Sequence, residues 1–288
     1  MNSKPIADVS IVSANYNNGA YLAQFIESIY SSTYLPKELL IIDDGSTDNS
    51  IEIIKKYNYD FIKLIRFDNN RGFANALNEG VKLAVGKYIL RVDPDDYIAP
   101  ARIEEQFKFL ESNPEIDLVG SNVSYFDSDT GERVFNSNVP IEQDDIVCAL
   151  RSGYCSIIHG SMMCKCLIML HFPYNQENVP AEDYELLSLI LKEGHAVRNL
   201  SDALTFVRIH VNSISNNLPF YTIQKTFQLN EKIWGVKNSR FKVRRIYLHL
   251  KYYRKFLFCK GGMKYIYLLF SLFFNPIKLV SRLIRYFH

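Results

Sequence analysis

The chain of 288 residues lacks the glycine-rich loops that hold phosphate groups in many nucleotide-binding proteins. Neither G-x-x-x-x-G-K-[ST] nor G-x-G-x-x-G occurs, which leaves P-loop and dinucleotide-binding interpretations without a phosphate cradle. Cysteine is scarce as well. The five cysteines form no C-x-x-C pair, and Cys164 and Cys166 have no second ligand pair for a zinc site. We therefore expect reduced thiols, which are typical of a cytosolic protein.

Acidic residues are absent from the C-terminal part of the chain. The last of the 31 acids is Glu231, whereas 12 of the 33 Lys and Arg residues lie in 240–288. The first 239 residues therefore carry a net charge of −10 and the remaining 49 carry +12, which gives the +2 of the whole chain. An acidic main domain disfavours nucleic acid as a partner.

A long apolar run and a secretory leader pattern are also missing. The most apolar segment, 265–274, has about ten residues, whereas a membrane-spanning helix needs about twenty. Basic helices with large aromatic faces tend to lie in the membrane interface, because anionic headgroups attract their cations. We therefore predict that 240–288 form a basic amphipathic, membrane-associating tail on a cytoplasmic protein that is peripheral on the inner face of a membrane. Packing on the main domain and an oligomer contact are the alternatives.

What the sequence does contain is an alternation of strand-like and helix-like segments. Short apolar runs bounded by turn residues predict strands, and apolar residues at helical spacing predict helices. Such an alternation favours an α/β domain, over residues 1–239, with a mostly parallel sheet covered by helices on both faces. The predicted strands are 9–12, 39–42, 61–66, 88–92, 116–123 and 203–209, and the predicted helices are 21–30, one that follows 46–48, 73–85, 101–112, 143–151 and 181–193.

Three polar clusters follow predicted strands, where open parallel sheets bind their ligands. They are residues 15–17, 43–44 and 93–96. The last cluster, Asp93-Pro-Asp-Asp96, holds three carboxylates that repel one another, so it indicates either a bound cation or a solvated acidic turn. Mg²⁺ or Mn²⁺ suits the first interpretation, because either ion takes one or two protein carboxylates and completes its shell with phosphate and water. Without a glycine-rich cradle, a diphosphate would be held mainly by such a metal.

Several motifs, taken in order along the chain, resemble the signature of the family 2 glycosyltransferases, which are inverting enzymes with the GT-A fold. The resemblance covers about residues 8–215. One departure is Ser13-Ala14-Asn15, where Ile-Pro-Thr is commoner in the family, and it implies a tuned nucleoside pocket. The motifs are Val9-Ser-Ile-Val-Ser-Ala-Asn-Tyr-Asn17, Asp43-Asp-Gly-Ser-Thr-Asp48, Asn70-Arg-Gly72, Gly86-Lys-Tyr-Ile89, Asp93-Pro-Asp-Asp96, His159-Gly-Ser161, Glu182-Asp183, and Arg208-Ile-His210 with Ser213 and Ser215.

The resemblance implies roles for individual residues. Asp44 would accept a hydrogen bond from the imide of the base, which favours uracil or thymine, and Asp93 would hold the ribose or a metal-bound water. Asp95 would bind the metal together with His210, and Asp183 would be the catalytic base. The other nucleotide-binding residues would be Ala14, Asn15, Tyr16 and Arg71, and those on the acceptor side would be His159 and Glu182.

The adjacent acids Glu182 and Asp183 point about 100° apart in a helix, so they would not both face the site. With Asp183 as the base, Glu182 is either an acceptor-side group or a solvated charge near a helix N-terminus. His159 has a structural alternative too, as a histidine whose partners lie within the fold. Arg208 either binds phosphate or flanks a strand.

We predict an inverting glycosyltransferase of the hexosyltransferase type, with Mn or Mg as cofactor. It would move a sugar from a UDP- or dTDP-type donor to a lipid-linked saccharide in cell-surface polysaccharide biosynthesis. A carboxylate base is needed because a sugar hydroxyl is a poor nucleophile at neutral pH, and one in-line displacement inverts the anomeric centre. A nucleotidyltransferase is one alternative, but the segment 15–19 lacks a basic residue. A non-catalytic sugar-nucleotide-binding subunit is another, although Asp95 and Asp183 are both present.

Overall fold

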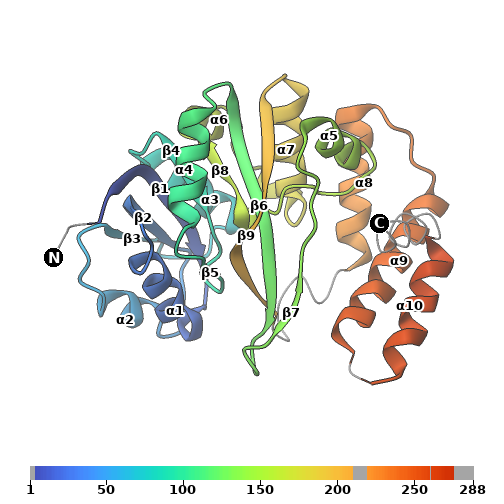
Figure 1. Ribbon diagram of the computed structural model, residues 1–288, viewed down its shortest axis with the longest axis horizontal. Helices are drawn as coiled ribbons and strands as arrows, with labels where there is room; N and C mark the ends of the chain where they lie inside the picture. Colours follow the sequence, from blue (N-terminus) through green and yellow to red (C-terminus); the bar gives the residue numbers. More distant parts are fainter. Residues whose placement is uncertain (1–3, 210–218, 260, 276–288) are drawn as a thin grey trace. The chain divides into compact units, whose positions relative to one another are not determined.

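The computed structural model describes residues 4–209, 219–259 and 261–275 (Figure 1). The described residues form two compact units. The sheet unit comprises those in 1–126 and 135–208, and the helical unit those in 127–134 and 209–288. The helical unit thus begins before the basic tail. The assignment of catalysis to 1–239 and of membrane association to 240–288 stays a prediction.

A nine-stranded mixed sheet organises the sheet unit. Its strand order is β3-β2-β1-β4-β8-β6-β9-β5, and β7 pairs with β6. The half around β1 is parallel, whereas β8 and β5 run antiparallel to their neighbours. The predicted α/β class, with a sheet flanked by helices, is confirmed. The strands are β1 (Ile6–Asn15), β2 (Leu35–Asp43), β3 (Ile62–Arg66), β4 (Tyr88–Arg91), β5 (Tyr97–Ile98), β6 (Ile116–Asp127), β7 (Arg133–Asn136), β8 (Met163–Lys165) and β9 (Ala196–Ile209).

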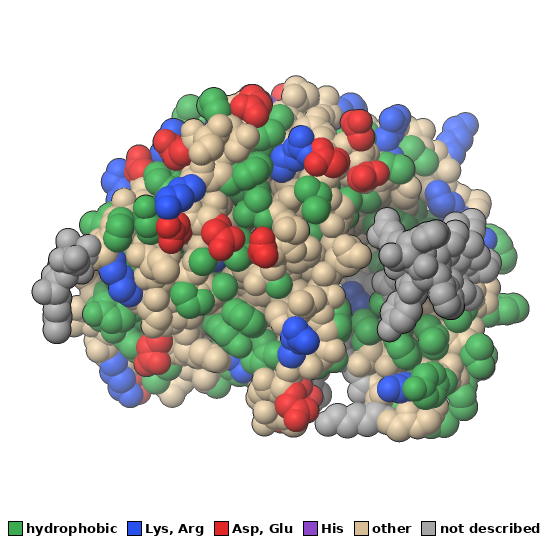
Figure 2. Space-filling view, in the orientation of Figure 1, with side chains coloured by type: hydrophobic (Ala, Val, Ile, Leu, Met, Phe, Trp, Pro, Cys, Tyr) green, Lys and Arg blue, Asp and Glu red, His purple; other side chains and the backbone are tan. Residues whose placement is uncertain are grey.

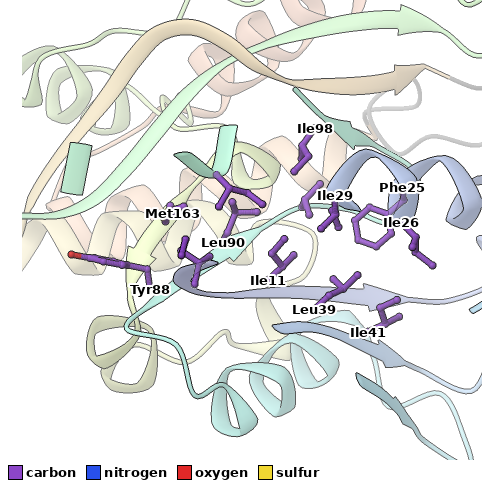
Figure 3. Packing of buried hydrophobic residues seen from close by; sticks show 14 of the residues in the cluster. Ile11, Phe25, Ile26, Ile29, Leu39, Ile41, Tyr88, Leu90, Ile98 and Met163 are labelled. Atoms are coloured by element: carbon purple, nitrogen blue, oxygen red, sulfur yellow. The ribbon is translucent and has the colours of Figure 1, made fainter. Parts of the chain in front are cut away.

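Helices cover both faces of the parallel half, because successive side chains of a strand point to opposite faces. On one face, Ile11 and Leu39 pack against Phe25 and Ile26 (Figure 3). On the other, a Cβ added at Gly80 would lie 2.5 Å from Cγ1 of Val12, so glycine permits the close approach of a helix. The helices of the sheet unit are α1 (Gly19–Tyr30), α2 (Ser50–Lys55), α3 (Phe73–Leu83), α4 (Arg102–Ser112), α5 (Gln143–Arg151), η1 (His159–Ser161), α6 (Cys166–His171), η2 (Gln176–Asn178) and α7 (Glu182–Lys192).

The loops after β1, β2 and β4 lie together at one edge of the sheet, where the strand order changes direction at β1. The side-chain oxygen of Asn17 accepts the backbone N–H of Thr47 at 2.8 Å, which joins the first two loops. The hydroxyl of Ser13 donates to the carbonyl of Val92 at 2.9 Å, which joins β1 to the start of the acidic loop. The three polar clusters predicted from the sequence therefore occupy the expected ligand-binding edge.

Three helices make up most of the helical unit: α8 (Phe220–Trp234), α9 (Arg240–Phe258) and α10 (Met263–Phe274). α8 ends at Gly235, whose φ of 70° suits glycine, and the hydroxyl of Ser239 caps the start of α9 by accepting the N–H of Lys242. The buried Ser271 hydroxyl and His249 Nδ1, 2.9 Å apart, join α10 to α9. Within the described residues, no helix is long and apolar enough to cross a membrane.

Candidate active site

The acidic loop begins with an ion pair between the last residue of β4 and the residue two positions further on. Arg91, at the end of β4, is 1% exposed, and its guanidinium pairs with Oδ1 of Asp93. Burial acts to raise the pKa of Asp93, but the positive charge of Arg91 outweighs it, so this pKa is lowered. Asp93 is thus held as a carboxylate at the ligand-binding edge.

The other two acids of the loop are attached to β9. Oδ1 of the buried Asp96 accepts the backbone N–H of Arg208 at 2.8 Å, and Nε of Arg208 donates to the carbonyl of Asp95 at the same distance. Burial and the charges of Asp95 and Asp93 raise the pKa of Asp96 well above its ordinary value. The side chain of Asp95 is only partly buried. Arg208 therefore holds the loop in place through these two hydrogen bonds, which is the structural alternative to a phosphate-binding role.

A short helical turn, η1, packs directly against this loop. A Cβ added at Gly160 would lie 3.4 Å from Oδ2 of Asp93 and 3.7 Å from Oδ2 of Asp96, so the glycine lies beside both carboxylates. Its neighbour His159 is hydrogen-bonded through Nε2 to the hydroxyl of Tyr174 at 2.7 Å. Burial and the charge of Arg91 lower the pKa of His159 to about 3, so the ring is neutral. His159 thus has a structural partner and also lies beside the site.

Glu182 and Asp183 open helix α7 and reach the same neighbourhood. Glu182 is 7% exposed and its Oε2 has no hydrogen-bond partner among the described residues, so the solvated-charge alternative is wrong. Burial, and next the charge of Asp183, raise the pKa of Glu182 to about 7. Asp183 is partly buried, and burial raises its pKa as well, with Asp93 contributing in the same direction. Two carboxyls of raised pKa near a third carboxylate are characteristic of functional sites.

Two groups hold the carboxyl of Asp183 in place. Its Oδ1 accepts the backbone N–H of Tyr184 at 2.6 Å, and the thiol of the exposed Cys155 donates to Oδ2 across 3.7 Å. Both contacts leave lone pairs free on a carboxylate, which offers about four acceptor positions. The carboxyl therefore keeps the capacity to accept a proton.

Asp44, one of the predicted nucleotide-binding residues, organises the loop that precedes α3. Its carboxylate is 3% exposed and accepts the backbone N–H groups of Arg71 (2.6 Å) and Gly72 (2.9 Å). The side chain of Arg71 is exposed and lies over the ring of Phe67 at 4.2 Å. Asp44 thus holds the 70–72 motif against the β2 loop and still has lone pairs for a ligand.

The motif over residues 9–17 contains both buried and exposed side chains. Ala14 and Asn15 are buried, and the Asn15 amide donates to Asp43 at 2.8 Å and to Ser46 at 3.1 Å. Tyr16, in contrast, is 48% exposed. Of these three, Tyr16 presents the side chain with which a ligand could stack, whereas Asn15 ties β1 to the β2 loop.

The structure describes only one of the two predicted metal ligands, Asp95. His210 lies outside the described residues. In the described part of the chain, the acidic loop included, no group of three or more His, Cys, Asp or Glu side chains could hold a metal ion by itself. The carboxylates of the acidic loop are nevertheless hard oxygen donors. Burial and, next, the charges of Asp95 and Asp93 raise the pKa of Asp96, and a cation would relieve the repulsion among these charges. This donor set fits Mg²⁺ or Mn²⁺ if a substrate supplies further oxygens.

Arg91 was missed by the sequence-based reasoning, although the sequence carried a signal for it. An arginine inside the apolar strand Tyr88-Ile-Leu-Arg-Val92 stands two positions before Asp93, so the two side chains share a strand face. Its Nε has no partner among the described residues although it is buried. Cys155 and Tyr174 gave no such signal, because their contacts depend on the tertiary structure.

This geometry is that of a GT-A glycosyltransferase: a parallel half-sheet, an acidic loop at its switch point and a carboxyl pair on a neighbouring helix. A sequence model described as Glycosyl transferase family 2 matches residues 10–164, more than half of the chain. The chain belongs to family 2 of the glycosyltransferases. It is therefore a transferase that uses a nucleotide-sugar donor, as predicted.

Individual relatives agree with this assignment. The UDP-Glc:alpha-D-GlcNAc-diphosphoundecaprenol beta-1,3-glucosyltransferase WfaP of Escherichia coli is 32% identical over 224 residues, which are 73% of this chain and 80% of that protein. TarS 1-349 of S. aureus, solved with UDP-GlcNAc, has a TM-score of 0.60 at 19% identity, over 87% of this chain and 73% of that one. Mannosyltransferase PcManGT from Pyrobaculum calidifontis, solved with GDP-Man and Mn²⁺, has a TM-score of 0.60 at 15% identity, over 97% and 76% of the two chains. The two structures support the GT-A fold.

Proposed function

We propose that the chain transfers a sugar, with inversion, from a UDP-type donor to a saccharide linked through diphosphate to a membrane lipid. The observation that carries the proposal is the position of Asp183. Its carboxyl lies close enough to Asp93 for the two charges to interact, although 90 positions separate them. A base beside the acidic loop is what an inverting displacement requires.

The donor nucleotide would occupy the edge formed by the loops after β1, β2 and β4. The exposed ring of Tyr16 would stack with the base, and Asp44 would accept the imide N–H of uracil through its remaining lone pairs. Asp93, kept ionised by Arg91, would accept hydrogen bonds from the ribose hydroxyls. Arg71 would contribute an exposed guanidinium to the phosphates.

Asp95 would hold a divalent metal, with His210 as a further ligand. Bound there, Mn²⁺ or Mg²⁺ would supply positive charge to the diphosphate leaving group. The half-buried position of Asp95 and the hard donors around it support this assignment, as does the Mn²⁺ in the structure of PcManGT.

Asp183 would take the proton of the attacking acceptor hydroxyl as the new glycosidic bond forms. Its raised pKa brings the carboxyl nearer to the working pH, where a general base is most effective. Tyr184 and Cys155 would hold the carboxyl in position. Glu182 and His159 would line the acceptor side of the same site.

The acceptor class is proposed from the name of WfaP, whose acceptor is a diphosphoundecaprenol-linked GlcNAc, and from the basic tail. Helix α10 exposes a row of apolar side chains that would enter the headgroup region of an anionic membrane while the cations of the tail contact lipid phosphates. The enzyme would then act on the cytoplasmic face of the membrane, in the synthesis of a cell-surface polysaccharide. The row consists of Ile266, Leu269, Phe270 and Phe273.

The proposal is tested by incubating the purified chain with a panel of nucleotide sugars and a short-chain lipid-diphosphate saccharide. We expect release of UDP from one UDP-sugar, and proton NMR of the product should show an anomeric configuration opposite to that of the donor. Transfer with retained configuration would contradict the single-displacement mechanism. Transfer exclusively from a GDP- or CMP-sugar would contradict the role of Asp44.

A further inference from the structure

The helical unit contains a groove between α8 and α9, of about 910 Å³, within the usual size of a ligand pocket. Side chains at helical spacing on each helix line it. From α8 these include Phe220, Gln224 and Gln228, and from α9 Arg240 and Arg244. The residues on each helix are four positions apart and therefore lie on one face.

The two arginines of the groove are exposed cations without a counter-ion. Neither guanidinium makes an ion pair or hydrogen bond with another described residue. Helix α9 has seven basic residues and no acid, so its own sequence offers no partner. Among the described residues that line the groove, Glu231 alone carries a carboxylate, which leaves this lining with an excess of positive charge.

The remaining lining matches the chemistry of a sugar. The rings of Phe220 and Tyr247 meet edge to face with centroids 5.2 Å apart, and they offer apolar surface to a pyranose face or a prenyl chain. Gln224, Gln228 and the carboxylate of Glu231 provide donors and acceptors for hydroxyl groups. Arginine is the side chain best suited to phosphate, because its planar fork donates two parallel hydrogen bonds.

We propose that this groove binds the diphosphate-saccharide headgroup of the lipid-linked acceptor, with Arg240 and Arg244 on the diphosphate and the α8 amides on the sugar. The inference rests on the proposed function, because it takes the acceptor class from there. The chain's own segment 276–288 is a poor occupant, since it carries Lys278, Arg282 and Arg285 and no acid. The surface over α9 and α10, on the right in Figure 2, shows hydrophobic and basic side chains, as a membrane-bound acceptor would require.

The test compares the full chain with the double variant Arg240→Gln/Arg244→Gln. A matched control, Lys237→Gln/Arg245→Gln, removes two exposed cations that do not line the groove. The fluorescence of Trp234, the single tryptophan of the chain and part of α8, reports binding. The probes are farnesyl-diphospho-N-acetylglucosamine, inorganic diphosphate, and anionic vesicles that lack the acceptor.

We expect the double variant to bind the farnesyl probe roughly tenfold or more weakly and to raise the acceptor KM by a similar factor. The donor KM should be unchanged, and the control should behave like the wild type in both assays. Equal acceptor KM values for the two variants in an active enzyme would overturn the groove assignment while leaving the proposed function intact. Inorganic diphosphate binding as tightly as the farnesyl probe would also overturn it, and so would a loss of vesicle binding in the double variant as large as its loss of probe binding. A wild type that binds the farnesyl probe but transfers no sugar to it would instead contradict the proposed function.

Discussion

The backbone N–H of Arg208 donates to Oδ1 of Asp96 at 2.8 Å, although 112 positions separate the two residues. This bond fastens the end of β9 to the acidic loop after β4. The arginine side chain reaches the carbonyl of Asp95 as well, so the conformation of the loop is set by a strand outside the parallel half-sheet. The backbone at Asp95 is therefore held by a contact from β9.

The acidic loop predicts a metal requirement. Asp95→Ala should abolish metal-dependent donor binding, because the chain has no glycine-rich loop to hold the diphosphate. EDTA should remove the activity of the wild type, and Mn²⁺ or Mg²⁺ should restore it. The measurement is calorimetric titration of UDP with and without metal, beside turnover. Full activity in EDTA would show that the acidic cluster acts without a metal.

The buried Glu182 predicts an unusual dependence of stability on pH. Its pKa is about 7 in the folded chain and near 4.5 when unfolded, so the folded state holds a proton that the unfolded state releases. The free energy of unfolding should therefore fall as pH rises from about 4.5 to about 7. Glu182→Gln cannot ionise, so it should flatten this dependence and be more stable than the wild type at pH 8 by about 2 kcal/mol. Thermal melts from pH 4.5 to 8 test this, with Glu177→Gln, a change at another acid, as control. Melting temperatures that change with pH in the same way in Glu182→Gln and in the wild type would contradict the buried-acid assignment.

The exposed row on α10 predicts membrane attachment through apolar side chains. Leu269 and Phe273 are 67% and 79% exposed, so changing both to Ser should cost little stability. The double variant should float with anionic liposomes much less than the wild type, especially in high salt, where the contribution of the cations is screened. Leu167→Ser/Leu170→Ser, which alters an exposed apolar pair on α6, is the matched control. Equal flotation of both double variants would remove this row from the membrane contact.

The parallel half of the sheet was predictable because buried parallel strands appear as continuous apolar runs. Leu39-Leu-Ile-Ile42 is such a run, and the acids after it lie at the strand end where ligands bind. The family motifs follow the same strand ends. The place of the predicted nucleotide-binding residues in the fold could thus be anticipated from the sequence, although the contacts of the Asn15 amide could not.

Other elements left too weak a pattern for prediction. β8 has three residues and is defined by pairing with β4 and β6, so its sequence shows no period. In α8, the buried positions include Thr222 and Asn230, which interrupt the apolar spacing of the helix. The burial of Glu182 depends on how α7 packs, and no local pattern distinguishes it from a solvated acid. Tertiary packing decides these features.

The central claim, that Asp183 is the base of a sugar transferase, is tested most directly on Asp183→Asn. Asparagine keeps the shape of the side chain but accepts no proton, so kcat should fall by roughly 10²–10⁴-fold. Binding of the donor, measured by calorimetry on the same preparation, should stay within about twofold of the wild type, because the change removes an interaction made only in the transition state. Near-normal turnover with intact donor binding would contradict the account and make Glu182 the next candidate for the base.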